Sequence, residues 1–310
     1  MVRKKSRKDT RLSDQIFYYL LSALAITIIL LFLGLIIYLF QSAKPVFADD
    51  SFSFFSTMTW SPTTDQYGVL AFAYGTFVTS LIALLISVPV SIGSALFLTQ
   101  ICPDIFRSFL RTLIELLAAI PSVVYGLWGI FILAPFIKNY IQPFLQEHTK
   151  SLPFFQGPPF GLGLFSAGLI LAIMITPTIT TISIEVLKSI PSIYSEGAKA
   201  LGATKWESIQ IAVIKPGFSG LVAAIIIGLG RAMGETMAVT MVIGNRADIS
   251  TSLFSPAATM ASVIANEYAE ASTVLHSAGL AAVGLSLLAL SVVVNLIIQI
   301  FIHRQKKKYI

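Results

Sequence analysis

Six long apolar segments constrain the fold of this chain more than any other feature of its sequence. They cover about residues 16–40, 69–98, 105–136, 161–184, 217–243 and 273–302. A helix needs about 20 apolar residues to cross the hydrocarbon core of a bilayer. The first segment is longer than a signal-peptide core, and no small-residue cleavage site follows it, so it is expected to remain as a span. The sequence therefore predicts an all-α polytopic membrane protein with six transmembrane helices.

The distribution of basic residues predicts the orientation of these helices. Six of the first eleven residues are basic, and four more lie in the last seven. With a cytoplasmic N-terminus, the cytoplasmic segments hold sixteen basic residues and the outer segments hold four, as the positive-inside rule requires. We therefore expect both termini in the cytoplasm. The net charge of +6 belongs to segments that flank the membrane, which indicates contact with lipid and no nucleic-acid partner.

Several classes of function are excluded by what the sequence lacks. Cys102 is the only cysteine, so we expect neither a disulfide within the chain nor a cysteine-based metal cluster. The histidines His148, His276 and His303 do not have the spacing of metal ligands. The sequence contains no P-loop, no dinucleotide-binding glycine pattern and no serine-hydrolase elbow. It therefore predicts a chain that is not an enzyme, with no catalytic residue, no metal site and no cofactor of its own.

Two charges interrupt the fifth apolar segment, Arg231 and Glu235. A charge near the bilayer centre costs about 2.5–3.5 kcal/mol. Arg231 lies 14 residues after Gly217, which is about 21 Å along a helix and past the middle of a core about 30 Å thick. A salt bridge along one helix gives only about 0.2–0.5 kcal/mol, and Arg before Glu is the poorer order. We therefore predict that Arg231 contacts a permeating anion, and that Glu235 orients and partly neutralises it.

Hydroxyl, glycine and proline residues accompany this pair. Thr236 and Thr240 are predicted to line the same pathway as Arg231 and Glu235. Gly228, Gly230 and Gly234 would allow close approach of a neighbouring helix, although plain packing explains each of these residues equally well. Prolines beside hydroxyl residues also occur at Pro89, Pro121 and Pro177. Kinked helices of this kind suit a pathway that opens and closes, with tolerated packing kinks as the simpler alternative for each proline.

The segment between the fourth and fifth apolar segments is expected to be a structured cytoplasmic loop, residues 186–216. Ser195 is predicted to cap a first short helix, Gly202 to end it, and Thr204 with Glu207 to form a capping box at the start of a second. Apolar contact surface on the loop is expected from Ala198, Leu201, Trp206, Ile209 and Val213. An exposed apolar patch indicates a docking site for a partner.

Residues of this loop carry a resemblance to a known family. Glu196-Gly197-Ala198, with Gly202 six residues after the glutamate and an aliphatic run before Pro216, is similar to the loop signature of ABC importer permeases. Gly197 stands where the general pattern has alanine, as in the phosphate branch, and Pro216 comes one residue later than usual. Segments 115–129, 228–245 and 266–270 resemble the third span, the fifth span and the last outer loop of phosphate permeases. The resemblance runs from about Tyr67 to the C-terminus.

The resemblance implies a permease subunit that moves inorganic phosphate into the cytoplasm of a bacterium by alternating access. The implied partners are a homologous permease subunit, two cytoplasmic subunits that bind ATP and Mg²⁺, and an extracytoplasmic phosphate-binding protein. Coupling to the ATPase is implied for Glu196, Gly197, Ala198, Gly202 and Trp206. A permease for molybdate or sulfate, and a membrane scaffold or sensor that moves no solute, stay open as alternatives.

The chain is expected to divide into four regions. They are a basic cytoplasmic N-terminus (1–15), the first transmembrane helix with its outer loop (16–68), the permease domain (69–302) and a basic tail (303–310). In the last outer loop, the apolar stretch 257–271 is too short to span. It is compatible with a re-entrant or interfacial helix and equally with a helix that packs on the outer ends of the spans. Arg111, Glu115 and Glu185 lie near the cytoplasmic surface, where a structural role is expected.

Overall fold

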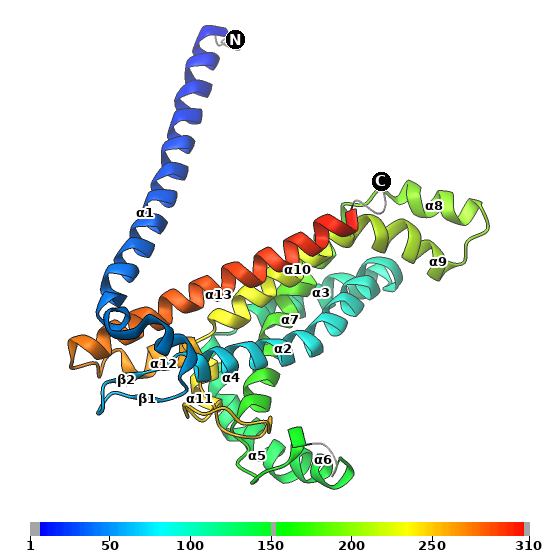
Figure 1. Ribbon diagram of the computed structural model, residues 1–310. Coiled ribbons are helices and arrows are strands. Elements are labelled where there is room, and N and C mark those ends of the chain that lie inside the picture. The colour runs from blue at the N-terminus through cyan, green and yellow to red at the C-terminus, as the bar shows by residue number, and fades with distance from the viewer. Residues whose placement is uncertain (1–6, 150–152, 307–310) are drawn as a thin grey trace.

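The computed structural model describes residues 7–149 and 153–306, which are almost entirely helical (Figure 1). Within these ranges, six segments are long and apolar enough to cross a membrane: Asp14–Phe47, Leu70–Ile101, Ser122–His148, Leu164–Lys188, Lys205–Gly234 and Val274–Ile300. The predicted all-α architecture with six spans is therefore confirmed. Parts of the predicted basic ends, residues 1–6 and 307–310, lie outside the described residues.

The elements follow one another along the chain with few long loops. The α-helices are α1 (Arg7–Ser56), α2 (Leu70–Leu96), α3 (Asp104–Ala119), α4 (Ser122–Trp128), α5 (Ala134–Phe136), α6 (Gln142–His148), α7 (Leu164–Lys188), α8 (Ser192–Ala200), α9 (Lys205–Ile209), α10 (Lys215–Gly234), α11 (Met237–Val242), α12 (Met260–Glu267) and α13 (Val274–Lys306). A short 3₁₀ turn, η4, covers Pro153–Phe155. Strands β1 (Trp60–Ser61) and β2 (Gln66–Tyr67) pair antiparallel, Trp60 with Tyr67 and Ser61 with Gln66.

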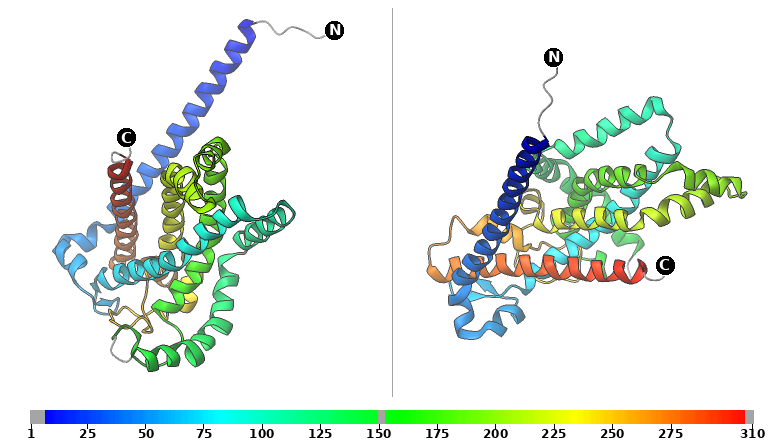
Figure 2. Two further views of the ribbon diagram at one scale, coloured as in Figure 1. Left: turned by 90° about the vertical axis from the view of Figure 1, so that its right-hand side faces the viewer. Right: turned by 90° about the horizontal axis from the view of Figure 1, so that it is seen from above.

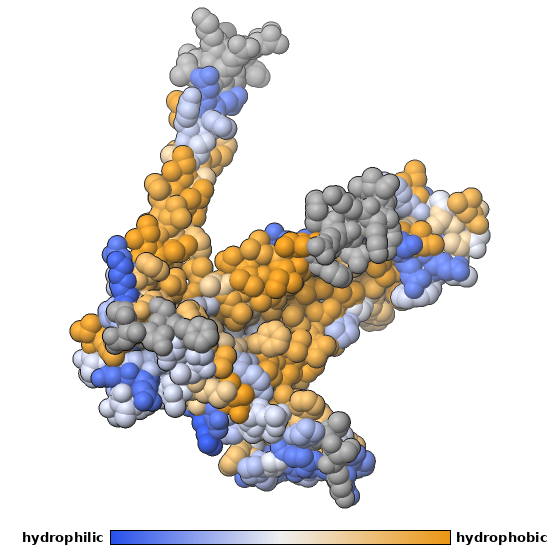
Figure 3. All heavy atoms as spheres, viewed as in Figure 1, coloured by the Kyte–Doolittle hydropathy of each residue, from blue (hydrophilic) through white to orange (hydrophobic). Residues whose placement is uncertain are grey.

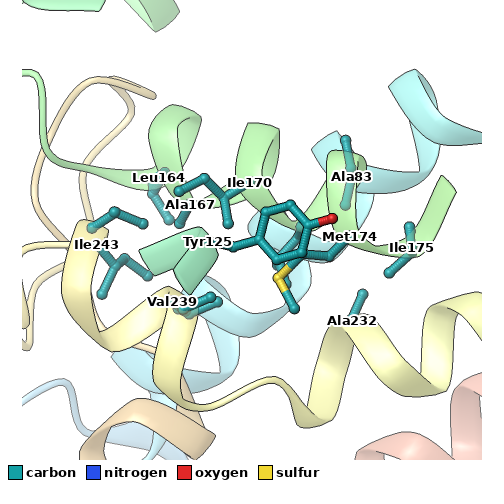
Figure 4. Packing of buried hydrophobic residues seen from close by; sticks show 14 of the residues in the cluster. Ala83, Tyr125, Leu164, Ala167, Ile170, Met174, Ile175, Ala232, Val239 and Ile243 are labelled. Atoms are coloured by element: carbon teal, nitrogen blue, oxygen red, sulfur yellow. The ribbon is translucent and has the colours of Figure 1, made fainter. Parts of the chain in front are cut away.

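Helix α7 forms the centre of the bundle, with α2, α3, α4 and α10 packed around it. In its most apolar stretch 67% of the residues are buried, against 0% in the first span, so α7 is the helix that the others cover. Tyr125 of α4 lies against this core beside Met174 and Ile175 of α7 and Ala232 of α10 (Figure 4). The buried α7 therefore provides the fixed surface on which the shorter helices are placed.

Helix α1 projects away from this bundle and packs on α13 only near its own C-terminal end (Figures 1 and 2). Ala43 and Phe54 are buried there, in a cluster with Leu280 and Val283 of α13. Apolar side chains cover the middle of α1 and the flank of α13, and hydrophilic side chains gather towards the ends (Figure 3). An exposed helix that is apolar all round suits lipid rather than water.

The third predicted span, 105–136, is wrong in its bounds. The chain breaks at Ile120, whose ψ of 128° is extended, because a residue that precedes proline is disfavoured in the helical region. Residues before the break form the separate helix α3, which buries no side chain completely. The span itself starts at Ser122 and continues to His148, beyond the predicted end at residue 136.

Proline also explains four π-helical stretches. They are η1 (Phe97–Ile101), η2 (Gly129–Leu133), η3 (Ile137–Ile141) and η5 (Gln210–Ile214). Each ends two residues before a proline: Pro103, Pro135, Pro143 and Pro216, respectively. In each case the residue before the proline donates its N–H five residues back, as Lys215 does to Gln210 O. Because proline has no N–H and crowds the preceding turn, the wider turn keeps the chain helical.

The apolar stretch 257–271 forms only the short helix α12, which Thr259 caps through a reciprocal pair of bonds with Ser262. Met260 and Val263 are buried against α2 and α13. This packing agrees with the alternative of a helix on the ends of the spans. The β-hairpin and α12 lie at one end of the bundle, and α8, α9 and the C-terminal end of α13 lie at the other (Figure 1).

Candidate functional site

The fifth span stops between its two charges, so the prediction of one continuous helix over 217–243 is wrong. Helix α10 ends at Gly234, and Glu235 is extended, with ψ of 127°. An oxygen of the Glu235 carboxylate accepts a hydrogen bond from the N–H of Ala238 at 3.3 Å, inside the first turn of α11. Glu235 thus satisfies a free N–H at the start of the next helix. Arg231 and Glu235 do not lie one turn apart on a single helix.

Arg231 reaches a different helix. Its Nη1 donates to Thr178 Oγ1 of α7 at 2.9 Å. The ion pairs found within the described residues involve other cations, so Arg231 has no carboxylate partner there, Glu235 included. The side chain is partly exposed rather than buried. A guanidinium with five N–H donors and one neutral acceptor keeps most of its capacity to bind an anion.

The position of Arg231 in α10 offsets only a small part of its cost in a membrane. It lies in the last turn of the helix, where backbone carbonyls without partners face a cation. Such a contact contributes about 0.3–1 kcal/mol, against about 2.5–3.5 kcal/mol for an arginine at the centre of a span. A helix end therefore does not account for this residue, and the positive charge stays available.

The structure places the two predicted pathway threonines just beyond Arg231, with their hydroxyls turned to their own backbone. Thr236 Oγ1 donates to Gly234 O at 3.2 Å, and Thr240 Oγ1 donates to Thr236 O at 2.7 Å. Neither hydroxyl contacts Arg231. Thr178, which does, follows the buried Pro177 in a stretch rich in threonine. The sequence carries no local signal for the role of Thr178, because its partner Arg231 is 53 residues away.

Close packing between α7 and α10 holds this contact in place. A Cβ at Gly228 would lie 2.5 Å from Ile179 Cγ1, so only glycine allows the observed approach. At Gly230 and Gly234 a Cβ would meet nothing within 4 Å. Of the three glycines that were candidates for close helix approach, only Gly228 therefore serves that purpose within this chain.

At the opposite end of the bundle, the loop between α7 and α10 has the predicted form of two short helices with a glycine turn. Gly202 has φ of +93°, a conformation that suits glycine. The capping box of Thr204 and Glu207 is present in full. The prediction that Ser195 caps the first helix is wrong, because α8 begins at Ser192, directly after the extended Pro191.

The surface of this loop is apolar in part. Leu201 and Trp206 are 92% and 57% exposed, as predicted. Ile209 and Val213 are buried instead, since α9 runs through η5 into α10 and turns them inward. Ile193 and Tyr194 of α8 are also exposed, which was not predicted from the sequence. Glu196, Gly197 and Ala198 lie on α8 between these residues and the Gly202 turn, and Ala198 is half-buried.

An ion triad ties α3 to α7 at the same end. Arg111 binds Glu115 and Glu185, each with an N···O distance of 2.8 Å. The hydrogen bond that Arg111 donates to the Glu115 carboxylate raises the pKa of Arg111 above its ordinary value. These contacts join two helices, in agreement with the structural role expected for the three residues.

Known proteins are similar to this chain over most of its length. The family model of the binding-protein-dependent transport system inner membrane component matches residues 88–307. The phosphate transport system permease protein PstC of Mesorhizobium japonicum is 43% identical over 94% of this chain and 91% of its own length. The protein of that name from Pasteurella multocida is 43% identical over 99% of both chains. The probable PstC of Methanocaldococcus jannaschii is 36% identical over 94% of both.

Among solved structures, a chain of the inward-facing MetNI methionine ABC transporter is similar, with a TM-score of 0.47 and 20% identity over 78% of this chain and 94% of that one. The family model alone covers well over half of the sequence, and the named relatives align over almost their whole length. This chain therefore belongs to the family of binding-protein-dependent transport system inner membrane components.

Proposed function

We propose that this chain is a PstC-like permease subunit of an ATP-driven importer, and that it moves inorganic phosphate across the bacterial inner membrane into the cytoplasm. The relatives named above support the choice of phosphate. The observation that carries the proposal is the arginine of the fifth span, which donates to Thr178 and has no carboxylate partner among the described residues. A positive charge of this kind inside a membrane is stabilised when an anion binds to it.

Phosphate suits Arg231 chemically. A planar guanidinium offers two parallel N–H donors to two oxygens of one phosphate, which a point charge does not. Because the ion has to leave again, a contact that is not enclosed by further cations is an advantage. We assign Glu235 to the same pathway, but not as a partner of Arg231. Its carboxylate accepts from the N–H of Ala238 and so stabilises the break between α10 and α11 next to Arg231. Thr236 and Thr240 line the exit from this break.

The exposed apolar side chains of α8 and α9 provide the docking surface for a cytoplasmic ATP-binding subunit in this proposal. That surface comprises Ile193, Tyr194, Leu201 and Trp206, with Glu196, Gly197, Ala198 and Gly202 as the backbone that shapes it. ATP and Mg²⁺ are bound and hydrolysed by two such subunits, not by this chain. A homologous permease subunit completes the pathway, an extracytoplasmic binding protein delivers phosphate, and both termini of this chain are cytoplasmic.

The uncompensated arginine also separates the proposal from its alternatives. A scaffold or sensor that moves no solute has no need of a charge at that depth. An importer of sulfate or molybdate does, so competition between anions has to decide between oxyanions.

The test is ATP-dependent uptake of radioactive phosphate by proteoliposomes that contain this chain, its partner permease and the two ATP-binding subunits, supplied with the binding protein. We expect uptake that excess unlabelled phosphate suppresses and that equal concentrations of sulfate or molybdate leave unchanged. Suppression by equal concentrations of sulfate or molybdate would assign the importer to another oxyanion. ATP hydrolysis without uptake of any oxyanion would contradict the proposal.

A further inference from the structure

Three threonines of α7 use their hydroxyl groups in two different ways. Thr176 Oγ1 donates to Ala172 O at 2.7 Å, and Thr180 Oγ1 donates to Thr176 O at 2.8 Å. Both hydrogens are therefore engaged within the helix, as is common for threonine in a helix. Thr178 accepts instead, from Arg231 Nη1 at 2.9 Å. Within the described part of the chain its own hydroxyl hydrogen has no acceptor, so a donor stays free beside the guanidinium.

This free donor lies next to the free donors of Arg231. A hydroxyl has one hydrogen and two lone pairs, so Thr178 can accept from Arg231 and donate to a third group at the same time. A hydroxyl oxygen that already accepts a charged hydrogen bond becomes a better donor, because bonds in a chain polarise one another. Two neighbouring oxygens of one tetrahedral oxyanion can then receive an N–H from Arg231 and the O–H from Thr178.

The two residues differ in how firmly they are held. Thr178 belongs to α7, the most buried span, where Pro177 and Ile179 on either side of it are buried. Arg231 lies three residues before the end of α10, next to the break at Glu235. A long side chain at a helix end keeps several rotamers, whereas a β-branched side chain on a buried helix is stiff. Thr178 is thus the fixed member of the pair, and it selects one arrangement of the guanidinium.

From these contacts we propose that Thr178 is a second anion contact of the pathway and the positioning residue of Arg231. Its oxygen holds the guanidinium, and its hydrogen is donated to the transported oxyanion. The proposal rests on the proposed function, since it needs an oxyanion in the pathway. It assigns the second anion contact to the fourth span. The neighbouring threonine hydroxyls, those of Thr176 and Thr180, bond only within their own helix.

The test compares variants in the complete importer with its binding protein, in proteoliposomes. Thr178→Val keeps the shape of the side chain and removes the hydroxyl, Thr178→Ser keeps the hydroxyl, and Thr176→Val is the matched control. We expect Thr178→Val to lower phosphate uptake on the order of tenfold, as loss of a hydrogen bond to a charged group does. Thr178→Ser and Thr176→Val should transport within about twofold of the unaltered importer, a difference small beside that loss.

A purely structural role is excluded by a double-mutant cycle. In an Arg231→Gln background, Thr178→Val should lower uptake by a smaller factor than it does alone, because part of its effect acts through Arg231; an equal factor in both backgrounds overturns the positioning role. If Thr178→Val prevents assembly of the complex, Thr178→Ala takes its place. Uptake by Thr178→Val equal to that of the unaltered importer, or a loss of the same size in Thr178→Ser or Thr176→Val, overturns this inference alone. No phosphate uptake by the unaltered, ATP-hydrolysing importer overturns the proposed function and this inference with it.

Discussion

Gly228 allows α7 and α10 to approach closely. The loss of stability on its replacement by alanine can be estimated from the contacts of the new Cβ. In Gly228→Ala the new Cβ would lie 2.5 Å from Ile179 Cγ1 and 2.6 Å from Ile179 Cδ1. Ile179 is fully buried and β-branched, so it has little freedom to turn away. Overpacking of this kind costs about 1–3 kcal/mol, whereas alanine in place of glycine favours a helix by about 0.8–1.0 kcal/mol.

Gly230→Ala is the matched control, because it brings the same helix propensity and its Cβ meets nothing within 4 Å. The free energies of unfolding of the two variants should therefore differ by the strain alone, about 1–3 kcal/mol. The assay is thermal unfolding of the purified chain in detergent. We expect a midpoint for Gly228→Ala that is lower by about 2–10 °C than that of Gly230→Ala. A midpoint equal to or higher than that of the control would show that the packing of α7 on α10 does not require glycine at position 228.

Three further variants address the end of the bundle that bears α8 and α9. Gly202→Ala should cost about 1–2 kcal/mol because φ is +93°, as thermal unfolding of the purified chain can measure; no loss would argue against the turn. Trp206→Ala should change stability by less than about 0.5 kcal/mol, since the side chain is 57% exposed, and should weaken copurification of the ATP-binding subunit at least about fivefold; unchanged copurification would remove Trp206 from the docking surface. Glu185→Gln should lower the free energy of unfolding by less than about 1 kcal/mol, because its ion pair with Arg111 is exposed. A larger loss in thermal unfolding would mean that the ion triad is shielded from water.

The sequence predicted well those features that depend on residues near one another. Length and apolar composition give the six spans, because a bilayer admits few other structures. The capping box at Thr204 and the turn at Gly202 depend on four residues or fewer, and both are present. The prediction that Ser195 caps the first helix of the loop was wrong, because this helix already begins at Ser192, directly after the extended Pro191.

Errors arose where a proline or a tertiary contact overrides the apolar pattern. Hydropathy does not register the break at Ile120, although the following Pro121 was a sufficient signal. Hydropathy did not register the end of α10 at Gly234 either, because apolar residues resume at Met237, directly after Glu235 and Thr236. The contact between Arg231 and Thr178 had no local signal, since packing of α7 on α10 creates it. The four-residue spacing of Arg231 and Glu235 was misleading, because the helix that would have joined them ends between them.

In the proposed function, Arg231 contributes its charge to transport and not to the stability of the fold. Arg231→Gln keeps a donor for Thr178 but removes the charge-assisted bond to phosphate, which contributes about 1.5–3 kcal/mol. We predict that phosphate uptake by the reconstituted importer falls about 10- to 150-fold, while the midpoint of thermal unfolding stays unchanged or rises because an uncompensated charge is lost. Uptake that is unimpaired in an intact Arg231→Gln importer would show that Arg231 is not an anion contact.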